Sequence, residues 1–198
     1  MTIDTNDMLN SILSSLSRID YIKPGDIPNI PLYMDQVTTF MDAQLSASKR
    51  YESDKILTKT MINNYAKNDL LPPPTKKKYS KEHLLLLVFI YYFKNLLTIT
   101  DIQALLKPIT DKYFQDSDSL TLEDIYNEVF RLEKSQIDVL KEDISNRYQL
   151  SRETFPDAPE EDQEFLKTFS FICLLSFDVY VKKQIIEKLI DQMNPPQK

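Results

Sequence analysis

This chain of 198 residues contains a single glycine, Gly25. Two-residue turns between β-strands favour glycine, because other residues reach the required backbone conformations only with strain. A chain with one glycine therefore rarely builds sheets from tight hairpins. Helices joined by loops of proline, asparagine and aspartate suit this composition better, and the sequence predicts an all-α fold.

The residues that most enzyme sites require are scarce. The chain has one histidine, His83, and one cysteine, Cys173. Nucleophilic catalysis pairs a serine or cysteine with a histidine base, and zinc sites are usually built from several cysteines and histidines. Phosphate-binding loops need several glycines at fixed spacing. We therefore expect no enzyme activity, no metal and no cofactor, with His83 packed or partly exposed near a helix start.

A lone cysteine cannot form an intramolecular disulfide and suits a reducing compartment. The N-terminus lacks a basic leader, and the longest apolar run near the C-terminus, "FSFICLLSF" at 169–177, is shorter than the roughly 20 residues of a membrane span. We expect a cytoplasmic protein without a signal peptide or a membrane segment.

Charge is unevenly distributed along the chain. The formal net charge is −6, yet residues 49–82 carry nine Lys and Arg against four Asp and Glu, a local charge of +5. Residues 111–167 carry sixteen acidic against seven basic side chains, a local charge of −9. The chain thus combines a basic segment with an acidic C-terminal half.

Apolar residues recur at helical spacing in seven segments, and Thr58, Ser80, Thr100 and Thr121 are the expected N-caps of four of them. The proline-rich stretch 22–33 is expected to be a linker. The apolar stripe expected in the sixth helix is Leu122, Ile125, Val129, Leu132, Ile137 and Leu140. The expected helices span 5–20, 34–45, 59–68, 81–97, 100–106, 121–148 and 161–193.

The helix expected at 59–68 precedes three prolines and a run of lysines. We expect it to bury Ile62 and to carry Asn63 and Asn64 at mid-helix, where asparagine is a poor helix former. Asparagine can pair with adenine in the major groove, and lysines neutralise phosphates, so the segment is typical of DNA binding. The same residues also fit a solvated loop beside a polar helix face, so both interpretations stand at this point.

Two resemblances bear on this choice. "LTKTMINNYAKNDLLPPP" (57–74) resembles the recognition-helix region of MerR-like regulators, with Thr58 at the cap, Ile62 and Tyr65 at the buried leucine and second tyrosine of "TLRYY", and 70–72 at "LLP". "YSKEHLLLLVFIYYFKNLLTITDIQALL" (79–106) is similar to the segment that follows in that family.

The chain is also similar to the bacterial domain-of-unknown-function 1836 family in "MDQVTTF", "LTKTMINNYAK" and "PPTKKKYSKEH", most strongly over 31–107. These resemblances imply a winged helix-turn-helix and a regulatory role, without an established ligand.

The expected organisation has three parts. Residues 1–30 form a helix and linker, 31–107 a MerR-like winged helix-turn-helix, and 108–198 a helical region that dimerises the protein or binds an effector or a partner. The expected ligand is double-stranded DNA, bound by a homodimer, since two half-sites multiply the base contacts. The expected DNA-contacting residues are Lys59, Thr60, Asn63, Asn64, Tyr65, Lys67, Lys76, Lys77 and Lys78.

The alternative function is a helical adaptor that binds protein rather than DNA. Its basic loop would meet an acidic partner, and its docking face would lie on the last helix. That face is more often core or a dimer seam. Its residues are Phe165, Phe169, Ile172, Leu175, Val179 and Ile186.

Overall fold

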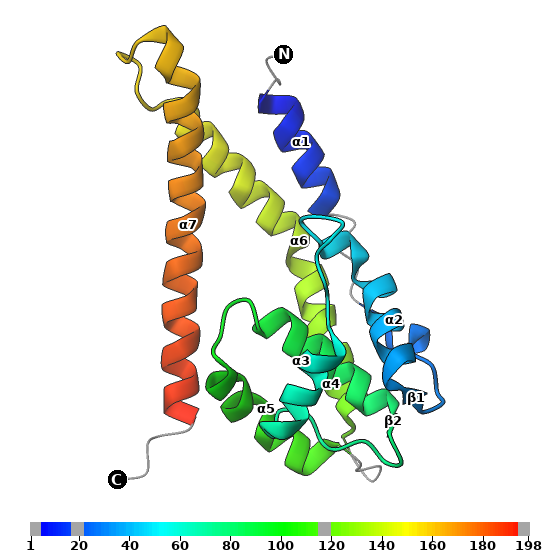
Figure 1. Cartoon of the computed structure of the whole chain (residues 1–198). Helices are drawn as coiled ribbons and strands as arrows, with labels where there is room; N and C mark the ends of the chain where they lie inside the picture. Colours follow the sequence, from blue (N-terminus) through cyan, green and yellow to red (C-terminus); the bar gives the residue numbers. More distant parts are fainter. Residues whose placement is uncertain (1–4, 17–21, 115–119, 194–198) are drawn as a thin grey trace. The chain divides into compact units, whose positions relative to one another are not determined.

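A computed structural model describes residues 5–16, 22–114 and 120–193 (Figure 1). The described residues form seven α-helices, two short 3-10 turns and one two-stranded sheet, which confirms the predicted all-α class. The chain divides into two compact units, residues 18–132 and residues 1–17 with 133–198. The division lies inside one helix.

The expected helices all occur, with shifted ends. The helix expected at 5–20 is observed to Leu16, because 17–21 lie outside the described residues. None of the helices in the described ranges has the length and apolar composition that crossing a bilayer demands. In chain order the elements are α1 Thr5–Leu16, η1 Pro24–Asp26, β1 Leu32–Tyr33, α2 Met34–Gln44, η2 Ser46–Ser48, α3 Lys59–Lys67, β2 Lys78–Tyr79, α4 Lys81–Phe93, α5 Ile99–Tyr113, α6 Leu122–Arg152 and α7 Glu160–Met193.

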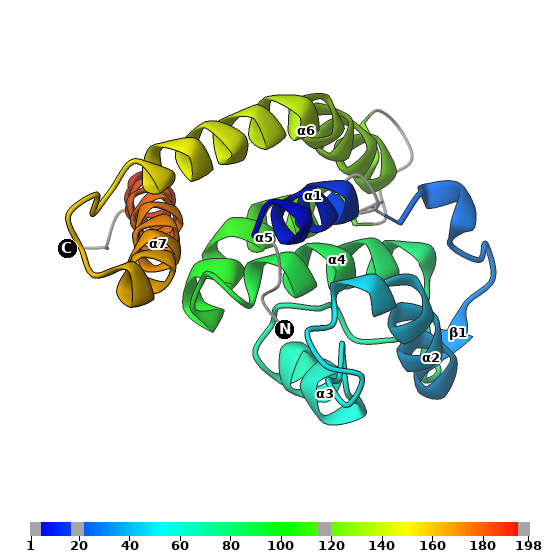
Figure 2. The same cartoon turned by 90° about the horizontal axis from the view of Figure 1, so that it is seen from above.

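Helix α4 is the centre of the 18–132 unit. All nine residues from 83 to 91 are buried, as expected for a helix that is apolar on nearly every face. Figure 2 shows α2 and α3 on one side of α4 and the first turns of α6 on the other. The Phe89 ring lies 5.4 Å from Tyr126 and 5.7 Å from Phe130, centre to centre. The helix ends at Phe93, four residues before the expected end.

The first turns of α6 bury a face that shares only Leu122 with the expected stripe. Leu122 is buried as expected, and Tyr126 and Phe130 are buried with it, whereas Val129 and Leu132 of the stripe are 44% and 53% exposed. Apolar residues occur on both faces, and the aromatic face is buried because large rings remove the most area from water. The buried Tyr126 hydroxyl also donates a hydrogen bond to the carbonyl of Ile22, at 2.7 Å.

The start of α5 also differs from the prediction. The N-cap is Thr98, whose hydroxyl oxygen accepts from the Asp101 amide at 3.2 Å, while the Asp101 carboxylate accepts from the Thr98 amide at 3.1 Å. This reciprocal pair replaces the expected capping box of Thr100 and Gln103. Both pairs have the three-residue spacing of a capping box, so spacing alone does not choose between them.

The end of α5 lies seven residues beyond the expected position, Leu106. The helix continues through Pro108 to Tyr113, because a proline removes only one backbone donor and tertiary packing can offset that loss. The extension brings the buried Phe114 to His83, with ring centres 4.8 Å apart.

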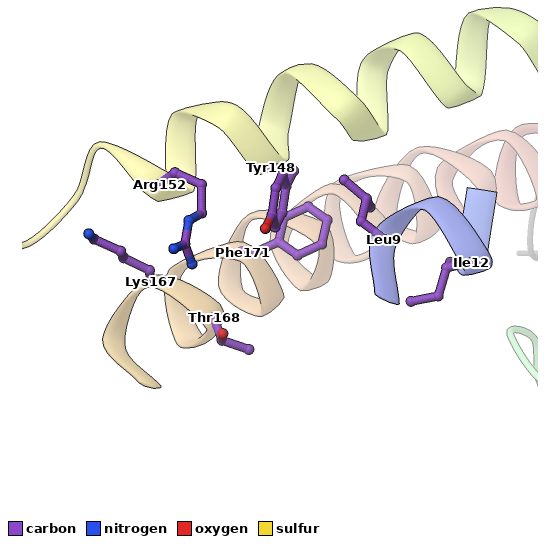
Figure 3. A pocket seen from close by; sticks show the side chains of 7 residues that line it. All are labelled: Leu9, Ile12, Tyr148, Arg152, Lys167, Thr168 and Phe171. Atoms are coloured by element: carbon purple, nitrogen blue, oxygen red, sulfur yellow. The ribbon is translucent and has the colours of Figure 1, made fainter. Parts of the chain in front are cut away.

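The other unit contains α1, residues 133–152 of α6, and α7. The two longer helices run antiparallel from the connection at 153–159 (Figure 1). Between them, the Tyr148 and Phe171 rings meet edge to face at 5.4 Å, beside Leu9 of α1 (Figure 3). The cavity drawn there is only about 20 Å³, room for about one water-sized sphere. This corner is therefore a packing contact rather than a ligand site.

Candidate nucleic-acid interface

Helix α3 is fixed at both ends by local hydrogen bonds. The Thr58 hydroxyl oxygen accepts from the Met61 amide at 3.1 Å, which confirms the expected cap. At the other end, the Leu70 amide donates to the Tyr65 carbonyl at 2.9 Å, while Asp69 adopts a left-handed backbone with φ 54°. This closure usually employs glycine after the last turn. The nine-residue helix therefore has sharply defined ends.

One face of α3 is polar and exposed. Ile62 and Tyr65 point into the core, with exposed fractions of 0% and 7%, so the expected burial of Ile62 is confirmed. The other expected contact residues of the helix lie on the opposite face, because positions three and four apart share one side of a helix. These exposed residues are Lys59, Thr60, Asn63, Asn64 and Lys67.

Tyr65 departs from its expected position at a DNA surface. Its ring packs inside, and burial raises the pKa of its hydroxyl above the ordinary value. In this arrangement the ring cannot lie along a phosphate backbone. Tyr65 instead anchors α3 to the rest of the unit, and the polar face is built without it.

A tight turn follows at 75–78. The Lys78 amide donates to the Thr75 carbonyl at 3.0 Å, and Lys76 and Lys77 have φ values of 50° and 65°. Positive φ at both central positions is the geometry of a type I′ turn, which usually contains Asn-Gly. The glycine-poor chain thus does form a two-residue turn, contrary to the general expectation, and builds it from two lysines.

The turn projects from a small antiparallel ladder. Leu32 pairs with Tyr79 and Tyr33 with Lys78, which joins β1 to β2. The side chains of Lys76 and Lys77 are exposed, as expected. The Lys78 ammonium instead lies 5.0 Å from the centre of the half-exposed Tyr33 ring, so part of its charge is directed at a neighbouring π-face.

Helices α2 and α4 hold α3 and the turn in place. Helix α2 packs against α3 and against both strands, so it links the two cationic parts. The ammonium of Lys94, directly after α4, donates to the Ile56 carbonyl at 2.7 Å, and the hydroxyl of Tyr91 in α4 bonds to Ser48. Burial lowers the pKa of Lys94. The long loop between α2 and α3 is therefore tied to the centre of the unit.

Acidic neighbours reduce the positive charge near the start of α3. Lys59 forms an ion pair with Asp35 of α2, and Lys49 pairs with Asp42 at 2.9 Å. An open hollow of about 480 Å³ lies between α2 and the start of α3. Its lining includes the cap Thr58, the lysines Lys55 and Lys59, and the acidic Asp42, so the hollow carries charges of both signs.

His83 forms an unexpected part of the support beneath the turn. It is 3% exposed, so it packs rather than remaining partly exposed, and its Nδ1 accepts from the Ser80 amide at 2.9 Å. Burial lowers the pKa of the imidazole. The nearby carbonyls of Pro73 and Pro72 and the carboxylate of Glu82 act in the opposite direction and raise this pKa by a smaller amount. Within the described ranges Nε2 makes no well-formed hydrogen bond. The sequence signal for this role is the position of His83 as the third residue of α4, because a side chain there can accept a hydrogen bond from the backbone amide of the N-cap residue.

Comparison with known proteins gives one family. The model of the family described as "Domain of unknown function (DUF1836)" matches residues 22–129, just over half of the chain. The matched stretch contains α3, the 75–78 turn and the helices that support them. It confirms the family predicted from the sequence. No curated protein and no solved structure matched the chain.

Proposed function

We propose that this chain, which belongs to the domain of unknown function (DUF1836) family, is a transcriptional regulator that binds double-stranded DNA. The single observation that carries the proposal is the exposed polar face of α3, where Asn63, Asn64 and Lys67 lie together on a helix fixed at both ends. The two asparagines at mid-helix cost helix stability, because asparagine is a poor helix former, and with Lys67 they offer groups that bind base edges and phosphates.

Helix α3 enters the major groove in this proposal. The groove is about 12 Å wide and admits an α-helix, and nine residues at 1.5 Å each give a helix on the order of 13 Å long. Asn63 and Asn64 read base edges, while Thr60 and Lys67 contact phosphate or sugar. Lys59 reaches a phosphate after exchanging its ion pair with Asp35, which is exposed and therefore weak.

The 75–78 turn follows the flanking phosphate backbone. Its strained backbone supports this role, because left-handed conformations of non-glycine residues cost free energy and gather at functional sites. Lys76 and Lys77 occupy those positions although asparagine and glycine would fit better. Lys78 adds charge from the strand next to Tyr33.

The order of elements fits a winged helix-turn-helix of the MerR-like type. Helix α2 precedes α3, and the small ladder with its turn follows as the wing. The protein acts in the cytoplasm as a homodimer in this proposal, and the acidic helical region supplies the dimer contact or an effector site.

Selection from a random DNA pool, followed by fluorescence anisotropy at 50–200 mM salt, tests the proposal. The variant K76A/K77A/K78A is expected to weaken binding to all sequences and to flatten the salt dependence, since each phosphate contact contributes about 0.9 to the slope of log K against log salt. The variant N63A/N64A is expected to lose sequence preference instead. The control K112Q/K134Q removes exposed lysines elsewhere. Absence of enrichment by the wild-type protein at 50 mM salt refutes DNA binding.

A protein-binding adaptor remains the second candidate. The observation in its favour is the long α7 helix, whose apolar side chains are widely exposed, including Phe165 at 71% and Phe177 at 68%. The ion pairs near α3 also reduce its positive field. If no DNA is enriched, this candidate takes the place of the first.

A further inference from the structure

His83 is a buried titratable side chain that the proposed DNA interface does not use. It is 3% exposed and lies in the first turn of α4, directly after β2 and the 75–78 turn. Its ring meets the rings of Tyr79 in β2 and of Phe114 edge to face, with centres 5.4 and 4.8 Å apart. The imidazole therefore joins β2 to the start of α4 and to the residue that follows α5.

The hydrogen bonds of the ring determine where its proton lies. Nδ1 is 2.9 Å from the backbone nitrogen of Ser80, and a backbone amide can only donate, so Nδ1 carries no proton. The Ser80 hydroxyl oxygen is also 2.9 Å from Nδ1. The proton of the neutral imidazole is then on Nε2, which is buried and makes no well-formed hydrogen bond within the described ranges. One acceptor nitrogen thus fixes the residue that precedes α4.

A second proton on this ring has to enter at Nδ1. The imidazolium has two N–H donors and no acceptor, so Nδ1 would direct a hydrogen at the Ser80 amide instead of receiving one. Its charge would also lie in the first turn of α4, where the helix dipole is positive, and between two buried aromatic rings. Protonation of His83 therefore removes the bond to Ser80 and opposes burial of the ring.

The titratable groups around the ring come from α4, β2 and α6. Burial lowers the pKa of His83 and outweighs the opposing effect of Glu82 in α4. In β2, burial raises the pKa of the Tyr79 hydroxyl, so this group is neutral in mild acid. Lys81 forms an ion pair at 2.8 Å with Glu123 of α6. The proline segment after α3 and the residue after α5 bring backbone carbonyls and an aromatic ring, not charges.

The 75–78 turn depends on the contact between Ser80 and His83. Its ladder is short, because β2 pairs with β1 over two residues. The left-handed backbones in the turn cost free energy and persist only where the surrounding packing holds them. Ser80 and His83 supply this support on the side of α4. Without it, the strained turn and the short ladder lose one of their two attachments.

We propose that the Ser80–His83 contact is pH-sensitive: it holds β2 and the 75–78 turn against α4 while His83 is neutral, and it releases them when the ring is protonated. In the open form the ring is in water and titrates near its ordinary value of about 6.5, whereas the closed form resists the proton. The stability that this contact supplies is therefore complete above about pH 6.5 and is lost as the pH falls below it. This inference goes beyond the proposed function, because it holds whether or not the turn binds DNA.

NMR of the full-length protein tests the geometry of the ring, since His83 is the only histidine in the chain. The two ring-nitrogen shifts are expected to give the tautomer protonated on Nε2 at about pH 7, and the ring is expected to titrate below about 6.5. A neutral ring protonated on Nδ1 overturns the proposal, as does a ring that titrates at or above about 6.5.

Hydrogen exchange measures the opening itself. An exposed imidazole is mostly charged at about pH 5.5, so the opening equilibrium of the Ser80 and β2 amides should rise severalfold from about pH 7.0, with an upper limit of about eight-fold. Their protection factors, corrected for the intrinsic pH dependence of exchange, should fall by the same factor. They should also be smaller than those of the α4 amides at 86–90, because the contact opens without unfolding the unit. A change of less than about two-fold overturns the proposal, as does exchange of the Ser80 amide only together with 86–90.

Two variants separate this pH response from a merely structural role. His83→Gln retains an acceptor at the third helical position, where glutamine completes a capping box, and its protection should be the same at both pH values. Glu82→Gln is the matched control: it removes the neighbouring charge and leaves the ring, so the severalfold loss of protection in acid should persist. A His83→Gln protein that still loses protection severalfold overturns the proposal, because another group would then be titrating. A wild-type protein that behaves as expected here but binds no DNA refutes only the proposed function.

Discussion

Replacing Lys76 by Asn and Lys77 by Gly should change stability and DNA affinity in opposite directions. Both lysines have left-handed backbones, with φ of 50° and 65°, at the two central positions of the turn. A left-handed conformation costs an ordinary residue roughly 1–2 kcal/mol, whereas asparagine and glycine adopt it readily. Glycine also gains entropy in the unfolded chain, which offsets about 0.5–1 kcal/mol. Summed over the two positions, the double variant should therefore be more stable by roughly 1–3 kcal/mol.

The same change removes two charges from the proposed phosphate contact. With about 0.9 per contact, the slope of log K against log salt should fall by about 1.8, and affinity at 0.15 M salt should fall on the order of 30-fold. Urea unfolding followed by circular dichroism measures the first effect, and anisotropy titrations between 50 and 200 mM salt measure the second. The control K112Q/K134Q should leave both nearly unchanged.

Each half of this reasoning can be refuted alone. A double variant that is less stable than the wild-type protein would mean that the lysines do not occupy left-handed conformations. A double variant with unchanged affinity and salt slope would mean that the turn lies away from the DNA, whatever its backbone geometry.

Three further changes test other parts of the structure. Asn63→Ala should reduce discrimination between sites by about 1–3 kcal/mol, whereas Lys67→Ala should weaken binding to all sequences alike, as competition titrations would reveal. Thr58→Ala should lower the free energy of unfolding by about 1 kcal/mol in urea titrations, because the cap of α3 is lost. His83 has a lowered folded-state pKa, so the unfolded chain binds more protons, and stability should fall as pH drops below about 6.5. His83→Gln can retain the hydrogen bond to Ser80 and should flatten that part of the pH–stability curve.

Local chemistry explains what the sequence could predict. Thr58 fixes the start of α3 through one side-chain hydrogen bond, and the prolines after Leu71 exclude its continuation, so both ends were readable from neighbouring residues. The exposed and buried faces of α3 followed from its periodicity. Tyr65 was the exception, because a tyrosine suits both a core and a phosphate contact.

The remaining features depended on distant partners. The buried face of α6 was chosen by the ring of Phe89, 37 residues before Tyr126, and no local pattern ranks two competing apolar faces. The extension of α5 through Pro108 depended on packing of Phe114 against His83. The turn at 75–78 was hidden because lysines occupy positions where sequence rules look for glycine.

The burial of α4 dictates where the chain can be cut. The segment "LLLLVFIYY" (84–92) has strong β-propensity and no charged side chain. The nearest charged residues are Lys81 and Glu82 before it and Lys94 after it. In the folded unit its Phe89 is covered by Tyr126 and Phe130. A truncated fragment that stops before residue 122 would expose this apolar segment to solvent and would be prone to aggregation. A soluble fragment for crystallisation or NMR should therefore run through residue 132.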